Sequence, residues 1–153
     1  MATTTKKKPA AKKKPAAKKP ASKPVKTEKY GDLKLGLPKW KPVHARISAI
    51  CAALPDTSEV MAWGHPNWKV GKGAKARMFA SWGAGEDMAS MGVMTDPFER
   101  KVLLEDERIT VAKYVGHKGW ISFRMDDPRK IDWELVERLL KTSYAVISGQ
   151  IPS

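Results

Sequence analysis

The spacing of hydrophobic residues along this chain predicts a helix on either side of a strand-rich middle. Apolar residues recur at helical intervals from Val43 to Leu54, after a proline suited to a first helical turn. Pro55 ends this pattern, so we expect a helix over about 42–54. A stronger apolar stripe follows Asp132, a good helix cap, and stops at Gly149, which predicts a C-terminal helix.

The middle of the chain changes to short apolar runs that are broken by turn residues. Between 59 and 95 these runs predict four strands joined by hairpin loops. The segment Asp96-Pro97-Phe98-Glu99 reads as an N-cap, a proline at the first helical position and a capping-box glutamate, opening a short helix to about Leu104. Two further strands are predicted near 109–114 and 119–125, with a turn at 116–119.

The predicted order of elements, α-β-β-β-β-α-β-β-α, indicates an α+β fold. We expect an antiparallel sheet with helices packed on it, preceded by a disordered basic tail. The tail covers 1–29, a linker rich in glycine and proline covers 30–41, and one domain covers 42–150. No apolar run approaches the roughly 18 residues that a membrane-spanning helix needs.

Charge is distributed unevenly between the tail and the rest of the chain. Residues 1–29 contain 11 lysines and one acidic residue, Glu28, which gives +10. The remainder holds 18 basic and 15 acidic residues, or +3, which together make the total of +13. The tail has no aromatic residue and one β-branched aliphatic residue, Val25, so it has little apolar surface to offset the entropy of ordering. Its prolines favour extended conformations that keep the lysines apart.

A disordered polycation of this kind predicts a polyanionic partner. If about eight lysines neutralise phosphates, the logarithm of the affinity falls against the logarithm of salt with a slope of roughly −7. The tail also resembles the Lys/Ala/Pro-rich tails of linker histones and histone-like bacterial proteins. The alternatives are a solubilising tail and a targeting sequence. The candidate DNA-binding residues in the tail are Lys6, Lys7, Lys8, Lys12, Lys13, Lys14, Lys18, Lys19, Lys23 and Lys26.

The domain adds one local concentration of positive charge. Lys69, Lys72, Lys75 and Arg77 fall within nine residues that span a predicted hairpin. Such a hairpin could act as a wing, with its lysines on phosphates and its arginine in a groove. Lys118, in a second basic turn, is a further candidate for DNA binding. The alternative is that these are ordinary solvated loop residues.

The tryptophans and a histidine offer a candidate pocket. Trp63, His65 and Trp68 lie close together in the sequence around a predicted turn, and they are possible ligand contacts. Among the six tryptophans, we expect those at 40, 63 and 68 to be the more exposed and those at 82, 120 and 133 to pack in the domain. Exposed rings could stack on bases.

The sequence shows little that points to enzyme chemistry. Its three histidines and its single cysteine lack the spacing of a zinc site, so we expect no metal and no cofactor. Cys51 falls on the apolar face of the first predicted helix and is expected to be a core residue. The acidic pairs follow one another directly, so they cannot readily form a carboxylate dyad. We expect no catalytic residues and no enzymatic activity.

Several short motifs, in a particular order, resemble the MmcQ/YjbR family. They are Trp63-Gly64-His65-Pro66, Trp68-Lys69-Val70, Lys75 through Met78-Phe79-Ala80, Lys118-Gly119-Trp120-Ile121, Asp132-Trp133 and Ser143-Tyr144. The likeness spans about 43–148. It implies a compact YjbR-like α+β fold and DNA binding without enzyme chemistry. Two features depart from the family pattern, the glycine-rich insert at 71–74 and the lysine-rich N-terminus.

These observations lead to one expectation for function and one alternative. We expect a non-enzymatic, largely sequence-nonspecific DNA-binding protein, with RNA as a possible partner, no membrane partner and an oligomeric state left open. The location would be the cytoplasm with its nucleoid in a bacterium, or the nucleus in a eukaryote. The alternative is a module that binds a small molecule or a partner protein, whose tail serves solubility or localisation.

Overall fold

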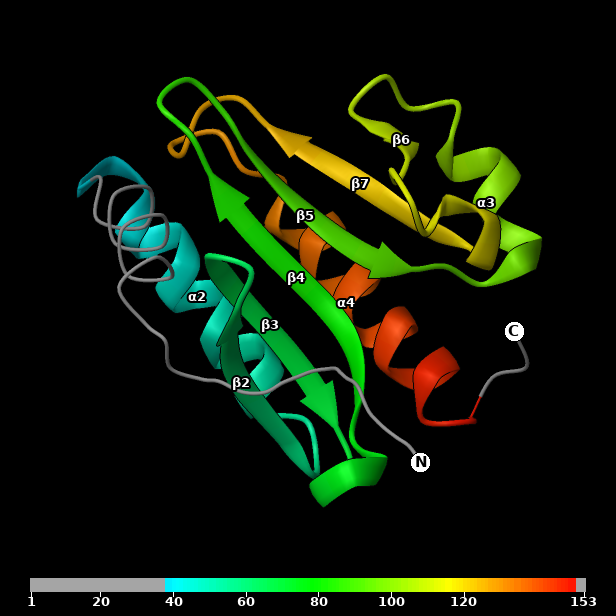
Figure 1. Ribbon diagram of the computed structural model, residues 1–153. Helices are drawn as coiled ribbons and strands as arrows, with labels where there is room; N and C mark the ends of the chain where they lie inside the picture. Colours follow the sequence, from blue (N-terminus) through cyan, green and yellow to red (C-terminus); the bar gives the residue numbers. More distant parts are fainter. Residues whose placement is uncertain (1–37, 151–153) are drawn as a thin grey trace, which may run out of the picture.

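The computed structural model describes residues 38–150, which form one antiparallel sheet with helices on one side (Figure 1). The predicted disordered tail and most of the predicted linker lie outside the described residues. A helix with the length and apolarity to cross a membrane does not occur within 38–150. The elements are η1 (Pro38–Trp40), α2 (Lys41–Ala52), β2 (Thr57–Ala62), β3 (His65–Val70), η2 (Gly73–Lys75), β4 (Arg77–Ala84), β5 (Ala89–Met94), α3 (Pro97–Leu103), β6 (Ile109–Val111), η3 (Gly116–Lys118), β7 (Trp120–Met125) and α4 (Trp133–Ile147).

The six strands are ordered β2-β3-β4-β5-β7-β6, and each neighbouring pair is antiparallel. Strands β2 to β5 are neighbours in chain order. After β5 the chain passes through α3 to the edge strand β6, and β7 then lies between β6 and β5. This arrangement confirms the predicted α+β fold class and the predicted order of the elements.

The helices α2 and α4 cover the same face of the sheet and leave the other face open, as Figure 1 shows. Alternate residues of the central strands point to the helices and form the core. Ser143 ties α4 to two strands, because its hydroxyl donates to the Phe79 carbonyl and accepts from the Met94 amide at 2.9 Å. The Tyr144 hydroxyl donates to the Pro55 carbonyl at 2.8 Å, which fixes α4 to the turn after α2.

The domain begins earlier than the sequence predicted. Trp40 is fully buried, and its ring packs edge-on against Trp82 with a centroid distance of 6.3 Å. Residues 38–41 are therefore part of the domain and not of a linker. The prediction that Trp40 is exposed is wrong, because η1 turns its ring under the sheet.

The predicted helix caps are confirmed, with one correction. Asp96 accepts a hydrogen bond from the Phe98 amide at 3.0 Å, and Asp132 accepts one from the Leu135 amide at 3.2 Å. Glu99, however, does not complete a capping box. Its carboxylate accepts from the Arg138 guanidinium at 2.7 Å and so joins α3 to α4.

A β-bulge in β4 alters which side chains face the helices. Trp68 pairs with Ala80 and Lys69 pairs with Met78, so Phe79 is an extra residue on β4. Phe79 and Ala80 are both fully buried although they are adjacent, and Phe79 packs edge-on against Tyr144 of α4 at 5.5 Å. The bulge therefore reverses which side chains of β4 face the helices in the residues before Phe79.

Candidate nucleic-acid interface

The hairpin between β3 and β4 carries the predicted basic wing. Lys69 is half-buried and pairs with Met78 on the open face of the sheet, whereas Lys72 and Lys75 are exposed at the tip. The Lys72 ammonium lies 4.0 Å from a carboxylate oxygen of Asp56 and its side chain is 89% exposed. An ion pair this exposed is weak, so the lysine can exchange it for a phosphate.

Arg77 does not project with the lysines of the wing. Its Nη1 donates to the carbonyl of Ile147 at 3.1 Å, at the C-terminal end of α4. This carbonyl is one of those that a helix end leaves without an intrahelical partner, and it carries partial negative charge. The bulge at Phe79 is the physical cause, because it turns Arg77 to the helix side of the sheet. Arg77 is exposed but its guanidinium lies apart from the lysines at the tip, and its predicted role in DNA binding stays a prediction.

Lys118 lies in a second basic turn at the same end of the sheet. It is exposed in η3, which directly precedes β7, and β7 starts beside the end of β5. The tip between β3 and β4 lies at this end too, because β4 runs antiparallel to β5. Both turns therefore lie toward the same end of the sheet, with β5 between their strands β4 and β7.

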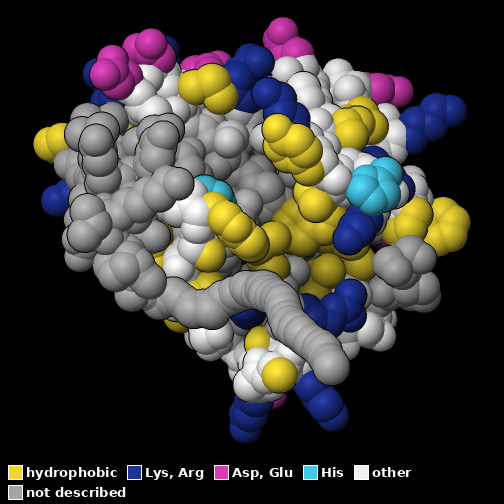
Figure 2. Space-filling model, in the orientation of Figure 1, with side chains coloured by type: hydrophobic (Ala, Val, Ile, Leu, Met, Phe, Trp, Pro, Cys, Tyr) yellow, Lys and Arg dark blue, Asp and Glu magenta, His cyan; other side chains and the backbone are white. Residues whose placement is uncertain are grey.

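The two basic turns are free of acidic residues in the sequence. No Asp or Glu occurs at 60–85, which contains the wing, or at 108–125, which contains η3. The opposite end of the sheet carries Glu86 and Asp87 in the turn after β4, and Asp126 and Asp127 directly after β7. Figure 2 shows acidic side chains along the upper edge of this face with basic side chains among them, and further basic side chains that project from its lower end. Each end also holds charges of the other sign: Asp56 lies 4.0 Å from Lys72 at the tip, and Arg124 and Arg129 pair with Asp126 and Asp127 at the opposite end.

The predicted pocket of Trp63, His65 and Trp68 is not formed. Trp68 is 2% exposed and points to the helices, so it is a core residue and the prediction that it is exposed is wrong. His65 lies on the opposite face, where its Cβ is 3.8 Å from the position that a Cβ on Gly83 would take. Trp63 is 80% exposed at the turn between β2 and β3, as predicted. Side chains of a strand alternate between the two faces of the sheet, so Trp68 and His65 of β3 point in opposite directions.

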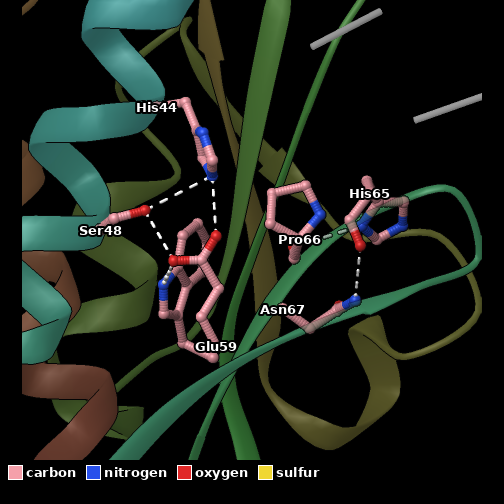
Figure 3. A network of polar contacts seen from close by, with 7 residues as sticks. His44, Ser48, Glu59, His65, Pro66 and Asn67 are labelled. Atoms are coloured by element: carbon pink, nitrogen blue, oxygen red, sulfur yellow. Dashed lines mark hydrogen bonds and ion pairs between the residues drawn. The ribbon is translucent and has the colours of Figure 1, made fainter. Parts of the chain in front are cut away.

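A polar network that the sequence did not reveal joins α2 to β2 (Figure 3). The hydroxyl of Ser48 donates to Glu59 Oε1 at 2.7 Å, and His44 Nε2 lies 2.9 Å from Glu59 Oε2. The indole of Trp68 donates to Glu59 Oε1 at 3.1 Å. The imidazole of His44 is also stacked on Trp82, with ring centroids 5.6 Å apart.

This network contains a serine, a histidine and an acid, but it lacks the geometry of a catalytic triad. In a triad, one imidazole nitrogen contacts the serine and the other contacts the acid. Here His44 Nε2 faces both Glu59 and, at 3.4 Å, Ser48, while the serine donates directly to the carboxylate. The histidine therefore does not stand between Ser48 and Glu59, and the three residues hold α2 against the sheet.

Cys51 is fully buried on α2, as predicted for a core residue. Burial, and then the nearby charge of Glu59, raise the pKa of its thiol to about 12. Among residues 38–150, no group of three or more His, Cys, Asp or Glu side chains is arranged to hold a metal ion.

Comparisons with known proteins agree with this fold. The family model described as YjbR matches residues 52–146. The chain is similar to the crystal structure of protein DR2400 of Deinococcus radiodurans, which carries the domain DUF419. The TM-score is 0.61 and the identity is 23%, over 69% of this chain and 78% of the other. A search of curated proteins found no match.

Proposed function

This chain belongs to the YjbR family, and we propose that within it the protein is a non-enzymatic, largely sequence-nonspecific DNA-binding protein. One observation carries the proposal: residues 1–29 hold a charge of +10, with 11 lysines against one acid. A polycation of this density releases counterions from DNA when it binds, which provides affinity without reading the base sequence.

The domain adds a second, weaker contact to this proposal. Lys72, Lys75 and Lys118 are exposed at the basic end of the sheet, and the acidic turns lie at the other end. These three ammonium groups attract phosphate, so this end of the sheet faces the nucleic acid. Linking two weak sites in one chain also raises the effective concentration of the second site.

The test of the tail is a titration of duplex DNA with the full-length chain across a salt series. If about eight tail lysines engage phosphates, we expect them to contribute roughly −7 to the slope of the logarithm of affinity against the logarithm of salt. Replacing the lysines at 6–8, 12–14, 18 and 19 with glutamine removes that charge while preserving chain length. We expect most of the slope to be lost. If the unmodified chain fails to bind duplex DNA at low salt, the proposal fails and the alternative binding module takes its place.

The contribution of the domain is tested by a triple substitution in the full-length chain. Lys72→Gln, Lys75→Gln and Lys118→Gln together should make the salt slope shallower by roughly 3. The matched control removes three exposed lysines away from the basic end, at positions 39, 41 and 130. Equal effects of the two triples would show that net charge alone matters and that the basic end of the sheet is no interface.

A further inference from the structure

Tyr114 is presented to solvent by an unusual backbone turn. Its side chain is 93% exposed, and its φ of +68° lies in the left-handed region. The Val115 amide donates to the Lys113 carbonyl at 2.7 Å, so Tyr114 is the central residue of a three-residue turn of the rare γ type. A bulky residue in this conformation is strained, and such strain is often found at binding sites.

The loop around Tyr114 is fixed by backbone hydrogen bonds. The Ala112 amide donates to Trp120 at 3.1 Å, the Lys118 amide donates to Val115 at 3.0 Å, and the Gly119 amide donates to Gly116 at 2.9 Å. The Gly119 carbonyl in turn accepts from both the amide and the hydroxyl of Thr95. Because these bonds hold the loop backbone before any ligand arrives, binding to Tyr114 needs no ordering of that backbone.

Close packing also holds this loop. A Cβ on Gly116 would overlap Cγ1 of Val111, so a larger residue here would require the exposed Val111 side chain to move. Arg100 of α3 reaches the same turn, with its Nη1 3.5 Å from the Gly116 carbonyl. The ring of Tyr114 therefore projects from a rigid support.

The surroundings of Tyr114 are positively charged. Lys113 is its immediate neighbour, and Lys118 and His117 follow in η3; all three are exposed. The acidic residues at the start of α3 are already engaged, since Asp96 caps the helix and Glu99 is paired with Arg138. A ring on a turn rich in exposed basic residues suits a base, because the phosphates next to that base can meet these side chains.

We propose that Tyr114 is a stacking platform for an unpaired base, so that this end of the domain binds single-stranded DNA. This proposal rests on the proposed function. In duplex DNA the faces of the bases are covered by their neighbours, whereas an unpaired base can turn onto an aromatic ring. Stacking of this kind changes affinity by roughly tenfold per base, and it tolerates any base because every base has an aromatic face.

The test uses full-length protein and a short oligothymidylate that carries one fluorescent adenine analogue. Tyr114→Gly removes the ring but keeps the left-handed turn without strain. Trp63→Gly is the matched control, because Trp63 is also exposed and also has a positive φ, of 54°, but lies at the opposite end of β3 from the basic tip. Tyr114→Phe keeps the ring and removes only the hydroxyl.

We expect Tyr114→Gly to weaken binding of the single strand by roughly tenfold and to abolish the stacking quench of the fluorescent base. Tyr114→Phe and Trp63→Gly should keep the affinity for the single strand and the quench of the fluorescent base. The affinity for a matched duplex should change by less than about twofold in every variant. The proposal is overturned if Tyr114→Gly binds and quenches like the unmodified chain, or if Trp63→Gly loses as much. Failure of the unmodified chain to bind either DNA would instead overturn the proposed function.

Discussion

The indole Nε1 of Trp68 donates a hydrogen bond at 3.1 Å to the carboxylate of Glu59, the residue paired with it on the neighbouring strand. The tryptophan is 2% exposed, whereas the side chain of Glu59 is 35% exposed. The carboxylate thus reaches from the edge of the core to satisfy a buried donor. The Ser48 hydroxyl shares the same oxygen, so one acid joins α2, β2 and β3.

Replacing Glu59 should therefore destabilise the domain. Glu59→Ala leaves the buried indole N–H without its acceptor, which costs about 1–3 kcal/mol in the free energy of unfolding. Glu59→Gln keeps an acceptor and should cost less. Urea unfolding measures both. Glu86→Ala, at an exposed turn, is the control and should change stability by less than about 0.5 kcal/mol. Equal stability of the variants at 59 and 86 would rule out this role for Glu59.

Asp106 and Arg108 make the stability of the domain depend on acid pH. Hydrogen bonds from the Arg108 side chain and amide lower the pKa of Asp106 to about 2. In the unfolded chain the pKa is near 3.9. Because the folded pKa is the lower one, the stabilisation is complete above the unfolded value and is lost as the pH falls from about 4 through about 2.

The measurement compares the unmodified chain with Asp106→Asn in urea at several pH values. The difference in unfolding free energy should be constant between about pH 5 and pH 7 and should shrink below about pH 4. A difference that is unchanged down to about pH 2 would mean that Asp106 titrates alike in the folded and unfolded chains.

The thiol of Cys51 should be unreactive in the folded protein. Its pKa of about 12 leaves almost no thiolate at neutral pH, and the side chain is fully buried. We expect a thiol-specific reagent at mildly alkaline pH to label the chain only after denaturant unfolds it. Rapid labelling under native conditions, at a rate independent of denaturant, would contradict the packing of α2 on the sheet.

Gly119 is a position at which the fold requires glycine. Its φ is +103°, and a Cβ there would lie 2.9 Å from the sulfur of Met94. Gly119→Ala should lower the free energy of unfolding by about 1–3 kcal/mol. Gly73→Ala is the control, because Gly73 also has a positive φ, of 59°, but has open space around it. If the two variants lose equal stability in urea, crowding at Met94 contributes nothing.

Much of the fold could be predicted because local patterns determine it. The apolar stripe after Asp132 identified α4, and the alternation of short runs identified the strands, since both repeats follow directly from backbone geometry. The position of the α2 face and the burial of Cys51 were predicted for the same reason.

The candidate site was harder to predict, because burial and direction depend on contacts between distant segments. Trp40 and Trp68 were expected to be exposed, but Trp40 packs against Trp82 of the sheet and Trp68 against His44 of α2, and both rings are buried. Tyr114 has no sequence motif around it, and its exposure becomes clear only from the turn that holds it. The network of His44, Ser48 and Glu59 likewise joins residues up to 15 positions apart, with no diagnostic spacing.

The sequence by itself determined where the charge lies along the chain, with +10 in residues 1–29 and near neutrality beyond, and it determined the order of helices and strands. Only the tertiary structure decided which basic residues of the domain lie at the same end of the sheet. One extra residue in β4 turns Arg77 to the end of α4, while antiparallel pairing brings Lys72, Lys75 and Lys118 to the same end of the sheet. The physical reason is that charge and periodicity are local properties, whereas the face and the end of the sheet that a side chain occupies follow from strand register.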